Sequence, residues 1–112
     1  QTGAVKVLSS HIKGGLSGHD VALILKGLTG MNRLLGIRSL IEAKKLKEDL
    51  TTEEVVKVLK GTGSSQTGAV KVLSSHIKGG LSGYDVELIL NGLTGINRRL
   101  GINALKEANK YK

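Results

Sequence analysis

The sequence contains no cysteine and no proline, and its only aromatic residues are two tyrosines. Without cysteine the chain has no disulfide and no thiolate metal ligand, which is compatible with a reducing, intracellular compartment. Without proline, no residue in the chain forces a helix to break. A core without phenylalanine or tryptophan must be built from Leu, Ile, Val and Ala, and such a core suits helices whose backbones approach each other closely.

The sequence also lacks long apolar runs and is poor in acidic residues. No stretch approaches the roughly 20 apolar residues of a membrane-spanning helix, and no signal peptide is recognisable, so we expect no membrane partner. Lysine and arginine total 17 against 9 acidic residues, which gives a formal net charge of +8. Such a charge favours an anionic partner, with nucleic acid before a membrane surface or an acidic protein, although it is also compatible with solubility alone.

Three segments share one pattern, which reads LSGHDVALILKG over residues 16–27, LTTEEVVKVLKG over 50–61 and LSGYDVELILNG over 81–92. Each has Ser or Thr in second place, an acidic residue three positions later and a closing Gly, so each predicts a helix with a capping box and a C-terminal glycine. The capping pairs are Ser17 with Asp20, Thr51 with Glu54 and Ser82 with Asp85, and the closing glycines are Gly27, Gly61 and Gly92. The starts lie 34 and 31 residues apart, a period typical of stacked helical repeats.

A larger duplication overlies this pattern, because residues 1–47 match residues 66–112 at a constant offset of 65. Ten of the 47 positions differ and the first 18 are identical, which indicates recent duplication or deliberate design. Three apolar positions of the first copy are charged in the second: Ala22 becomes Glu87, Leu34 becomes Arg99 and Ile41 becomes Lys106. A unit that precedes another unit buries such positions and a terminal unit exposes them, so the second copy is predicted to end the stack.

Apolar residues at helical spacing predict four further helices. They cover residues 2–13, 31–46, 67–78 and 96–111. The predicted fold is therefore all-α, an α-solenoid of helix–loop–helix repeats of about 31–34 residues with seven helices. Its expected parts are a half repeat at 1–15, repeats at 16–49 and 50–80, and a terminal capping repeat at 81–112. The exposed face of the half repeat also predicts self-association, and a strand over residues 4–8 stays open as an alternative because apolar residues and lysine alternate there.

Glycine-rich loops connect the two helices of each predicted repeat. In a solenoid these loops line up along one edge, and glycine lets a ligand approach the backbone closely. Each loop opens a helix N-terminus, which favours an anion, and Arg33 and Arg98 follow two of the loops. A row of phosphates is the expected partner, unless the loops are only tight turns between antiparallel helices. The predicted DNA-binding residues are Gly27, Leu28, Thr29, Gly30, Asn32, Arg33, Gly61, Thr62, Gly63, Ser65, Gln66, Gly92, Leu93, Thr94, Gly95, Asn97 and Arg98.

Residues 50–66 resemble the repeats of transcription activator-like effectors and their relatives, which open with Leu-Thr-Pro-x-Gln-Val-Val and place a Gly-rich loop before Lys-Gln-Ala-Leu. The matching residues are Leu50, Thr51, Val55, Val56, Gly63 and Gln66, whereas the family's Pro is missing. The resemblance implies repeats that wrap the major groove of DNA. It further implies base-facing residues at Leu28, Thr62 and Leu93, loop-bracing residues at Gly27, Gly61 and Gly92, where the family has Asn or His, and phosphate-side residues at Asn32, Gln66 and Asn97.

Other kinds of site have little support in the sequence. No phosphate-binding or dinucleotide-binding glycine fingerprint is present, and no nucleophile lies near a base and an orienting group. His11 and His76 are one position in two copies without a carboxylate at ligand spacing, so we expect no metal, no cofactor and no enzyme activity. The first hypothesis is a module that binds double-stranded DNA along its loop edge and helix N-termini. The alternative is a structural or protein-interaction scaffold, natural or designed, without a nucleic-acid role.

Overall fold

The computed structural model describes residues 13–111, and this part of the chain is mostly helical, as the all-α prediction requires. Six α-helices and two 3-10 turns lie in this range, which contains no strand longer than an isolated bridge. Their bounds are α2 Gly18–Ile24, α3 Gly30–Glu42, α4 Thr52–Leu59, η1 Gly63–Ser65, α5 Gln66–Leu73, η2 Ser74–His76, α6 Gly83–Ile89 and α7 Gly95–Glu107. The helix expected over 2–13, the alternative strand over 4–8 and the half repeat fall almost wholly outside the described residues. Every helix between residues 13 and 111 is too short or too polar to cross a membrane.

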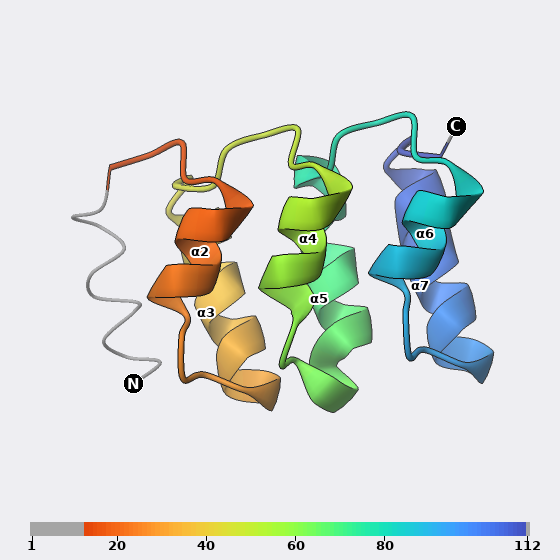
Figure 1. Cartoon of the computed structure of the whole chain (residues 1–112), viewed down its shortest axis with the longest axis horizontal. Helices are drawn as coiled ribbons and strands as arrows, with labels where there is room; N and C mark the ends of the chain where they lie inside the picture. Colours follow the sequence, from red (N-terminus) through yellow and green to blue (C-terminus); the bar gives the residue numbers. More distant parts are fainter. Residues whose placement is uncertain (1–12, 112) are drawn as a thin grey trace.

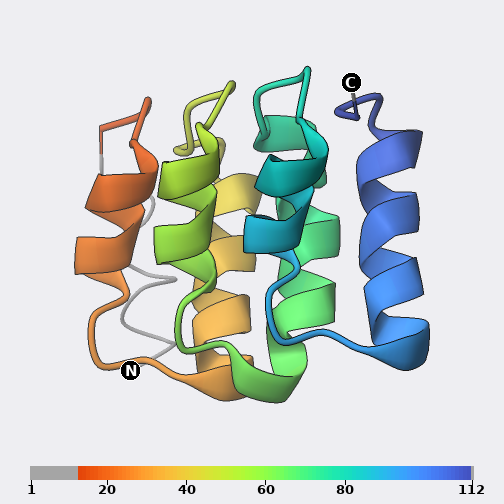
Figure 2. The ribbon, with the colours of Figure 1, turned by 45° about the vertical axis from the view of Figure 1, so that its right-hand side comes forward.

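The described helices pair into three hairpins that lie side by side (Figure 1). We call them hairpin 1 (residues 16–47, with α2 and α3), hairpin 2 (50–78, with α4 and α5) and hairpin 3 (81–111, with α6 and α7). The first helices of the hairpins form one layer, in which α4 packs against α2 and α6. The second helices form the other layer, in which α5 packs against α3 and α7, and both layers are visible in Figure 2.

The predicted capping boxes are confirmed in all three first helices. In α4 the Thr51 hydroxyl accepts a hydrogen bond from the Glu54 N–H at 3.2 Å, and the Glu54 carboxylate accepts one from the Thr51 N–H at 3.0 Å. These helices are shorter than expected, because the closing glycines lie two or three residues beyond the last helical residue, in the turn. The helix expected over 31–46 likewise ends at Glu42, since Lys44 takes a left-handed φ of 58° and turns the chain.

Each hairpin is closed at its ends by a short parallel bridge, which sequence periodicity did not predict. The bridges join Leu16 to Leu46, Leu50 to Ile77 and Leu81 to Tyr111. In hairpin 2 the Leu50 N–H donates to the His76 carbonyl and the Leu50 carbonyl accepts from the Lys78 N–H, both at 2.8 Å. The bridges hold the start of each first helix beside the end of each second helix, so the connecting loops are left together at the opposite edge (Figure 1).

The core lies between the two layers and is aliphatic, as the composition requires. Its most buried large side chains are Leu25, Ile37, Leu40, Leu50, Leu73, Ile77, Ile89, Leu90 and Leu105. Glycine lets the two helices of a hairpin approach, because a Cβ added at Gly36 would lie 2.6 Å from the Leu25 Cδ2 atom. Leu34 is only 8% exposed and packs towards Gly68 of the next hairpin, whereas its counterpart Arg99 in hairpin 3 is exposed. The end face of hairpin 3 is therefore more polar than the equivalent face of hairpin 1.

Candidate functional site

The three loops between paired helices lie along one edge of the molecule (Figure 1). We call this edge the glycine rim and define it as residues 26–30, 60–63 and 91–95. In each loop two glycines take left-handed backbone angles, with φ of 90° at the first and 55–57° at the second; they are Gly27 and Gly30, Gly61 and Gly63, and Gly92 and Gly95. The Gly30 N–H donates to the Gly61 carbonyl at 2.8 Å, so the loops of hairpins 1 and 2 are joined directly. The rim is thus a row of glycine backbone.

The side chains at the family's base-facing places turn away from this rim. Leu28 is buried and lies beside Gly36 on α3, while Leu93 is half-buried and lies beside Gly101 on α7. Thr62 is only 1% exposed, and its hydroxyl donates to the Leu59 carbonyl at 2.7 Å. These three residues belong to the core and the turn, not to the outer surface that the resemblance implies.

Arg33 is also buried, which is at odds with its predicted role as a phosphate contact. It is 6% exposed, and its guanidinium donates to four backbone carbonyls. The acceptors are Val58 at 2.9 Å, Lys57 at 3.1 Å, Leu25 at 3.1 Å and Leu28 at 3.5 Å. Burial lowers the pKa of Arg33, but the carbonyls at the C-terminal end of α4 carry partial negative charge and favour the cation. Arg33 therefore fastens hairpin 1 to hairpin 2.

The corresponding places in the other hairpins are Gln66 and Arg98, since each of the three residues follows the second rim glycine by three positions. Gln66 donates from its amide to the Ile89 carbonyl at 3.1 Å and the Asn91 carbonyl at 3.0 Å, so it fastens hairpin 2 to hairpin 3. Arg98 forms an ion pair with Glu87 inside its own hairpin. In hairpins 1 and 2 the side chain at this position bonds to the next hairpin. In hairpin 3, the last one described, it bonds within its own hairpin.

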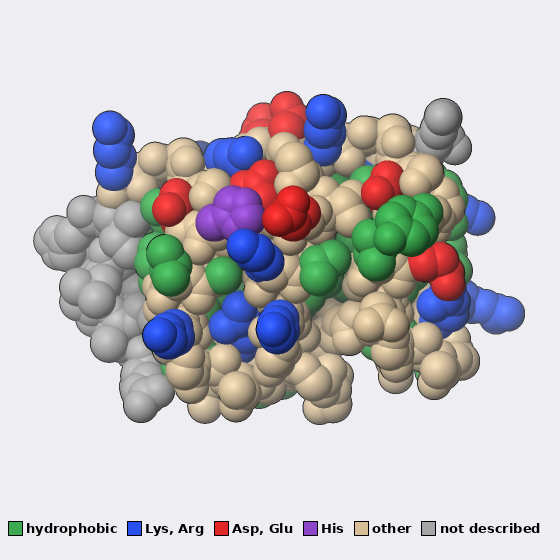
Figure 3. Space-filling view, viewed as in Figure 1, with side chains coloured by type: hydrophobic (Ala, Val, Ile, Leu, Met, Phe, Trp, Pro, Cys, Tyr) green, Lys and Arg blue, Asp and Glu red, His purple; other side chains and the backbone are tan. Residues whose placement is uncertain are grey.

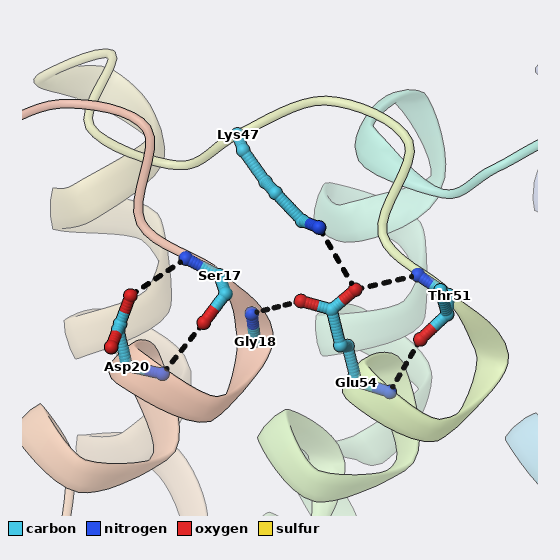
Figure 4. A network of polar contacts seen from close by, with 6 residues as sticks. All are labelled: Ser17, Gly18, Asp20, Lys47, Thr51 and Glu54. Carbon is cyan, nitrogen blue, oxygen red and sulfur yellow. Dashed lines mark hydrogen bonds and ion pairs between the residues drawn. The ribbon is translucent and has the colours of Figure 1, made fainter.

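At the opposite ends of the first helices, Glu54 joins α4 to α2 (Figure 4). Its carboxylate accepts from the Gly18 N–H at 2.8 Å and lies 3.1 Å from the Lys47 ammonium. Burial alone raises the pKa of this carboxyl, but the hydrogen bonds from Thr51 and Gly18 and the charge of Lys47 outweigh it and hold the pKa at about 2 instead of 4.5. The cluster is structural, because every oxygen of Glu54 already has a partner within the chain.

Two exposed lysines lie within the rim and a third lies beside it, and all three were missing from the predicted site. Lys26 and Lys60 immediately precede the first rim glycine of hairpins 1 and 2, and Lys57 lies one helical turn before Lys60. Over α2 and α4, basic side chains gather next to the rim and acidic side chains gather at the far ends of the helices (Figure 3). In hairpin 3 the corresponding residues are Leu88 and Asn91. The Lys-Gly pair that ends the repeated pattern at 26–27 and 60–61 was the signal in the sequence that could have identified this surface.

The remaining predicted residues are distributed along the rim and the starts of the second helices. Thr29 and Thr94 cap α3 and α7 without a side-chain capping bond, and both are exposed. Asn32 and Asn97 are exposed in the first turns of these helices, whereas Ser65 is half-buried at the start of α5. Between residues 13 and 111, no three His, Asp or Glu side chains gather where they could hold a metal ion. What the rim offers chemically is backbone N–H groups, the hydroxyls of Thr29 and Thr94, the ammonium groups of Lys26 and Lys60 and the amide of Asn91, with Lys57 beside it.

Comparisons with protein-family models, with curated proteins and with solved structures find no match for this chain.

Proposed function

We propose that the row of hairpins is a short α-solenoid of repeats that binds double-stranded DNA along the glycine rim. The observation that carries the proposal is the coincidence of three features on one edge: aligned glycine loops, the exposed starts of α3 and α7, and the exposed lysines Lys26, Lys57 and Lys60. Glycine lets a phosphate approach the backbone, and ammonium groups neutralise it. The net charge of +8 adds a general attraction for nucleic acid.

Within this proposal the contacts differ from those that the resemblance to transcription activator-like effectors implies. Arg33, Leu28 and Thr62 stabilise the loops of the rim from inside the protein and would not touch DNA, because their polar groups are bonded within the chain and their apolar groups are buried. The lysine ammonium groups, the Thr29 and Thr94 hydroxyls and rim N–H groups other than those that donate within the chain, such as Gly30 and Thr62, would meet phosphates. We therefore propose that the chain shares with this family the arrangement of its repeats but not the roles of individual loop residues.

Duplex binding and its dependence on the lysines can be tested together by fluorescence anisotropy with a labelled duplex. The logarithm of affinity should fall linearly with the logarithm of salt concentration, with a slope of about −0.9 for each phosphate contact. Changing Lys26→Gln and Lys60→Gln together should weaken binding and make the slope shallower by about 1.8.

A matched control changes Lys71→Gln and Lys78→Gln, which are exposed lysines on α5 and at the bridge of hairpin 2. This variant loses the same charge away from the rim, so it should keep most of the salt slope. Equal effects of the two double variants would contradict a local site, and a wild-type chain that binds no duplex at about 50 mM salt would end the DNA proposal.

The scaffold alternative is favoured by a different observation, the exposure of apolar side chains on the first-helix layer. Leu23 is 71% exposed on α2 and Tyr84 is 73% exposed on α6. Scattered exposed apolar residues of this kind are common on soluble proteins, but a protein partner would use them. A folded chain that fails to bind any duplex would leave this alternative as the better account.

A further inference from the structure

We propose that the outer face of the second-helix layer is a docking surface for an amphipathic helix of a partner protein. The partner helix carries an acidic stripe beside its apolar stripe. The layer consists of α3, α5 and α7, with α5 packed between the other two (Figure 2). The surface is formed by the helices and not by the glycine rim, so the inference does not rest on the proposed DNA binding.

Equivalent positions of the three helices form rows across this face. The row five positions after the second rim glycine is Leu35, Gly68 and Leu100, and the row eight positions after it is Arg38, Lys71 and Asn103. Leu35 is 36% exposed and Leu100 is 48% exposed, while the residues of the second row are all exposed. The face therefore has an apolar row and, about one helical turn further along, a row of two cations and an amide.

A groove between α5 and α7 can receive an apolar side chain of the partner. Its volume is about 420 Å³. Gly68, Leu100 and Ala104 give it an apolar lining, and Lys71 and Lys106 are the cations that line it. Because Gly68 has no side chain, the surface is low over α5, and a bulky side chain of the partner fits there.

The groove exists because one junction between hairpins is less filled than the other. Leu34 packs from α3 towards Gly68 on α5 and is buried. Thr67 has the equivalent place in hairpin 2 and lines the groove, but its side chain is smaller. The Thr67 hydroxyl is buried and has no hydrogen-bond partner among the described residues. The junction of hairpins 2 and 3 thus leaves space and an unused hydrogen-bonding group.

The charges on this face determine which kind of partner fits. Arg38, Lys71 and Lys106 attract carboxylates beside the apolar row, whereas a wholly apolar partner would cover these cations without pairing them. A nucleic-acid backbone is disfavoured, because the apolar row gives its phosphates no hydrogen bond and the exposed Glu42 and Glu107 repel them. An acidic amphipathic helix satisfies both rows, as in other cases where a helix binds in a groove.

The width of the layer sets the length of the partner helix. Neighbouring packed helices lie about 8–10 Å apart, so the row from Leu35 to Leu100 spans roughly 16–20 Å. A helix rises about 1.5 Å per residue, so about 11–13 residues cover that distance. The docking segment is therefore about three turns long, with apolar residues at every third or fourth position.

The test uses a labelled peptide of about 16 residues, with leucines at every third or fourth position and glutamates beside them. A comparison peptide has lysine in place of each glutamate. Fluorescence anisotropy should show that the acidic peptide binds at least about tenfold more tightly. Lys71→Glu should weaken its binding about five- to tenfold. Lys78→Glu, with the same charge change at the bridge of hairpin 2, should change it by less than about twofold.

Thr67→Leu tests the groove itself, because leucine fills it as Leu34 fills the preceding junction. We expect the acidic peptide to bind this variant about tenfold more weakly or less, while the urea midpoint stays the same or rises. Leu100→Gln changes an exposed residue of the apolar row and should also weaken binding, without altering the core.

Three outcomes would overturn the inference. They are no binding of the acidic peptide at about 100 μM protein, equal binding of the two peptides, and equal binding of the acidic peptide to the wild type and to both Thr67→Leu and Leu100→Gln. Displacement of the bound peptide by an unlabelled duplex would also overturn it, because the face would then belong to a nucleic-acid surface.

Discussion

At the residue scale, the most informative side chain is Arg33, which carries its charge among backbone carbonyls and not beside a carboxylate. Two of its acceptors belong to its own hairpin, and the other two, on Val58 and Lys57, end the first helix of the next one. A planar guanidinium with five N–H donors suits such a site, and a lysine would not span it. Arg33 is therefore a fastener between hairpins, and its removal should affect stability before it affects binding.

We predict that Arg33→Met lowers the free energy of unfolding by at least about 2 kcal/mol, because buried carbonyls lose their donor while the aliphatic stem is kept. Arg98→Met is the matched control, since Arg98 occupies the same place in hairpin 3 and makes an ion pair with the exposed Glu87. It should change stability by no more than about 1 kcal/mol. Urea unfolding followed by circular dichroism measures both, and equal losses would contradict the fastening role.

The low pKa of Glu54 predicts how the stability of the fold changes at acidic pH. Its pKa is about 2 in the folded chain and 4.5 as an ordinary value, so the unfolded chain takes up this proton more readily as the pH falls. The stabilisation from Glu54 is therefore fully present above about pH 4.5 and is lost as the pH falls towards 2. Glu54→Gln should be less stable at pH 7 and should lose less stability between pH 4.5 and 2.

The measurement is the urea midpoint at a series of pH values for the wild type and for Glu54→Gln, with Glu53→Gln as the control. Glu53 is the exposed neighbour of Glu54, so its variant should follow the wild-type curve. A Glu54→Gln curve parallel to that of the wild type would show that the depressed pKa does not contribute to folding.

Sequence reasoning predicted the residues with local partners and missed those with distant partners. The capping box of Thr51 and Glu54 was predictable because its two residues are three positions apart. The contact of Glu54 with Gly18 and the contacts of Arg33 with hairpin 2 join residues 24–36 positions apart, which no local pattern reports. From the sequence alone, an arginine next to a helix N-terminus is predicted to bind an anion. Only the position of the next hairpin shows that this arginine is buried.

At the scale of elements, the first helices depend on how closely they approach one another. A Cβ added at Gly18 would lie 2.4 Å from the Glu54 Cβ atom and 2.7 Å from the Glu54 carbonyl oxygen, so α2 and α4 touch through backbone at this point. Gly83 is the corresponding residue of α6, and nothing lies within 4 Å of a Cβ added there. The duplicated sequence thus places the same glycine in two different surroundings.

We predict opposite effects for Gly18→Ala and Gly83→Ala. The first should destabilise the chain by about 1–3 kcal/mol, because backbone of α4 must move to admit the methyl group. The second should be neutral or stabilising by up to about 1 kcal/mol, because alanine restricts the unfolded chain and clashes with nothing. Thermal unfolding of the two variants decides this, and equal melting temperatures would contradict the described contact between α2 and α4.

The existence of these elements followed from the sequence more reliably than their ends. Apolar spacing and capping residues located every α-helix between residues 13 and 111, because these signals act within one or two turns. The ends were shorter because residues such as Leu46 and Ile77 join bridges to leucines 27–30 positions earlier in the chain. The second helices end early because their following residues pair with distant residues in these bridges, and hydrophobic periodicity does not predict such pairing.

At the scale of the whole molecule, charge is distributed unevenly even though the hairpins are alike. Over α2 and α4 the acidic side chains lie towards the bridges, whereas basic side chains lie towards the rim and also at the bridge end, where Lys47 pairs with Glu54 (Figure 3). Hairpin 3 has Asn91 where the other two have Lys26 and Lys60. The net charge of +8 was enough to predict an anionic partner, but only the arrangement of the hairpins shows that these lysines share one edge. The lysine variants proposed above test that arrangement directly.

The longest unchanged stretch of the duplication has a consequence for how such a chain changes length. In its second copy, residues 66–83, it begins at α5 in hairpin 2 and ends in the first turn of α6 in hairpin 3. The identical stretch therefore spans the connection between two hairpins and does not correspond to a single hairpin. Adding or removing one 65-residue period inside this stretch rejoins identical sequence. Because the stretch includes the segment between hairpins 2 and 3, the bridge residues Ile77 and Leu81 and the capping Ser82 would keep their places.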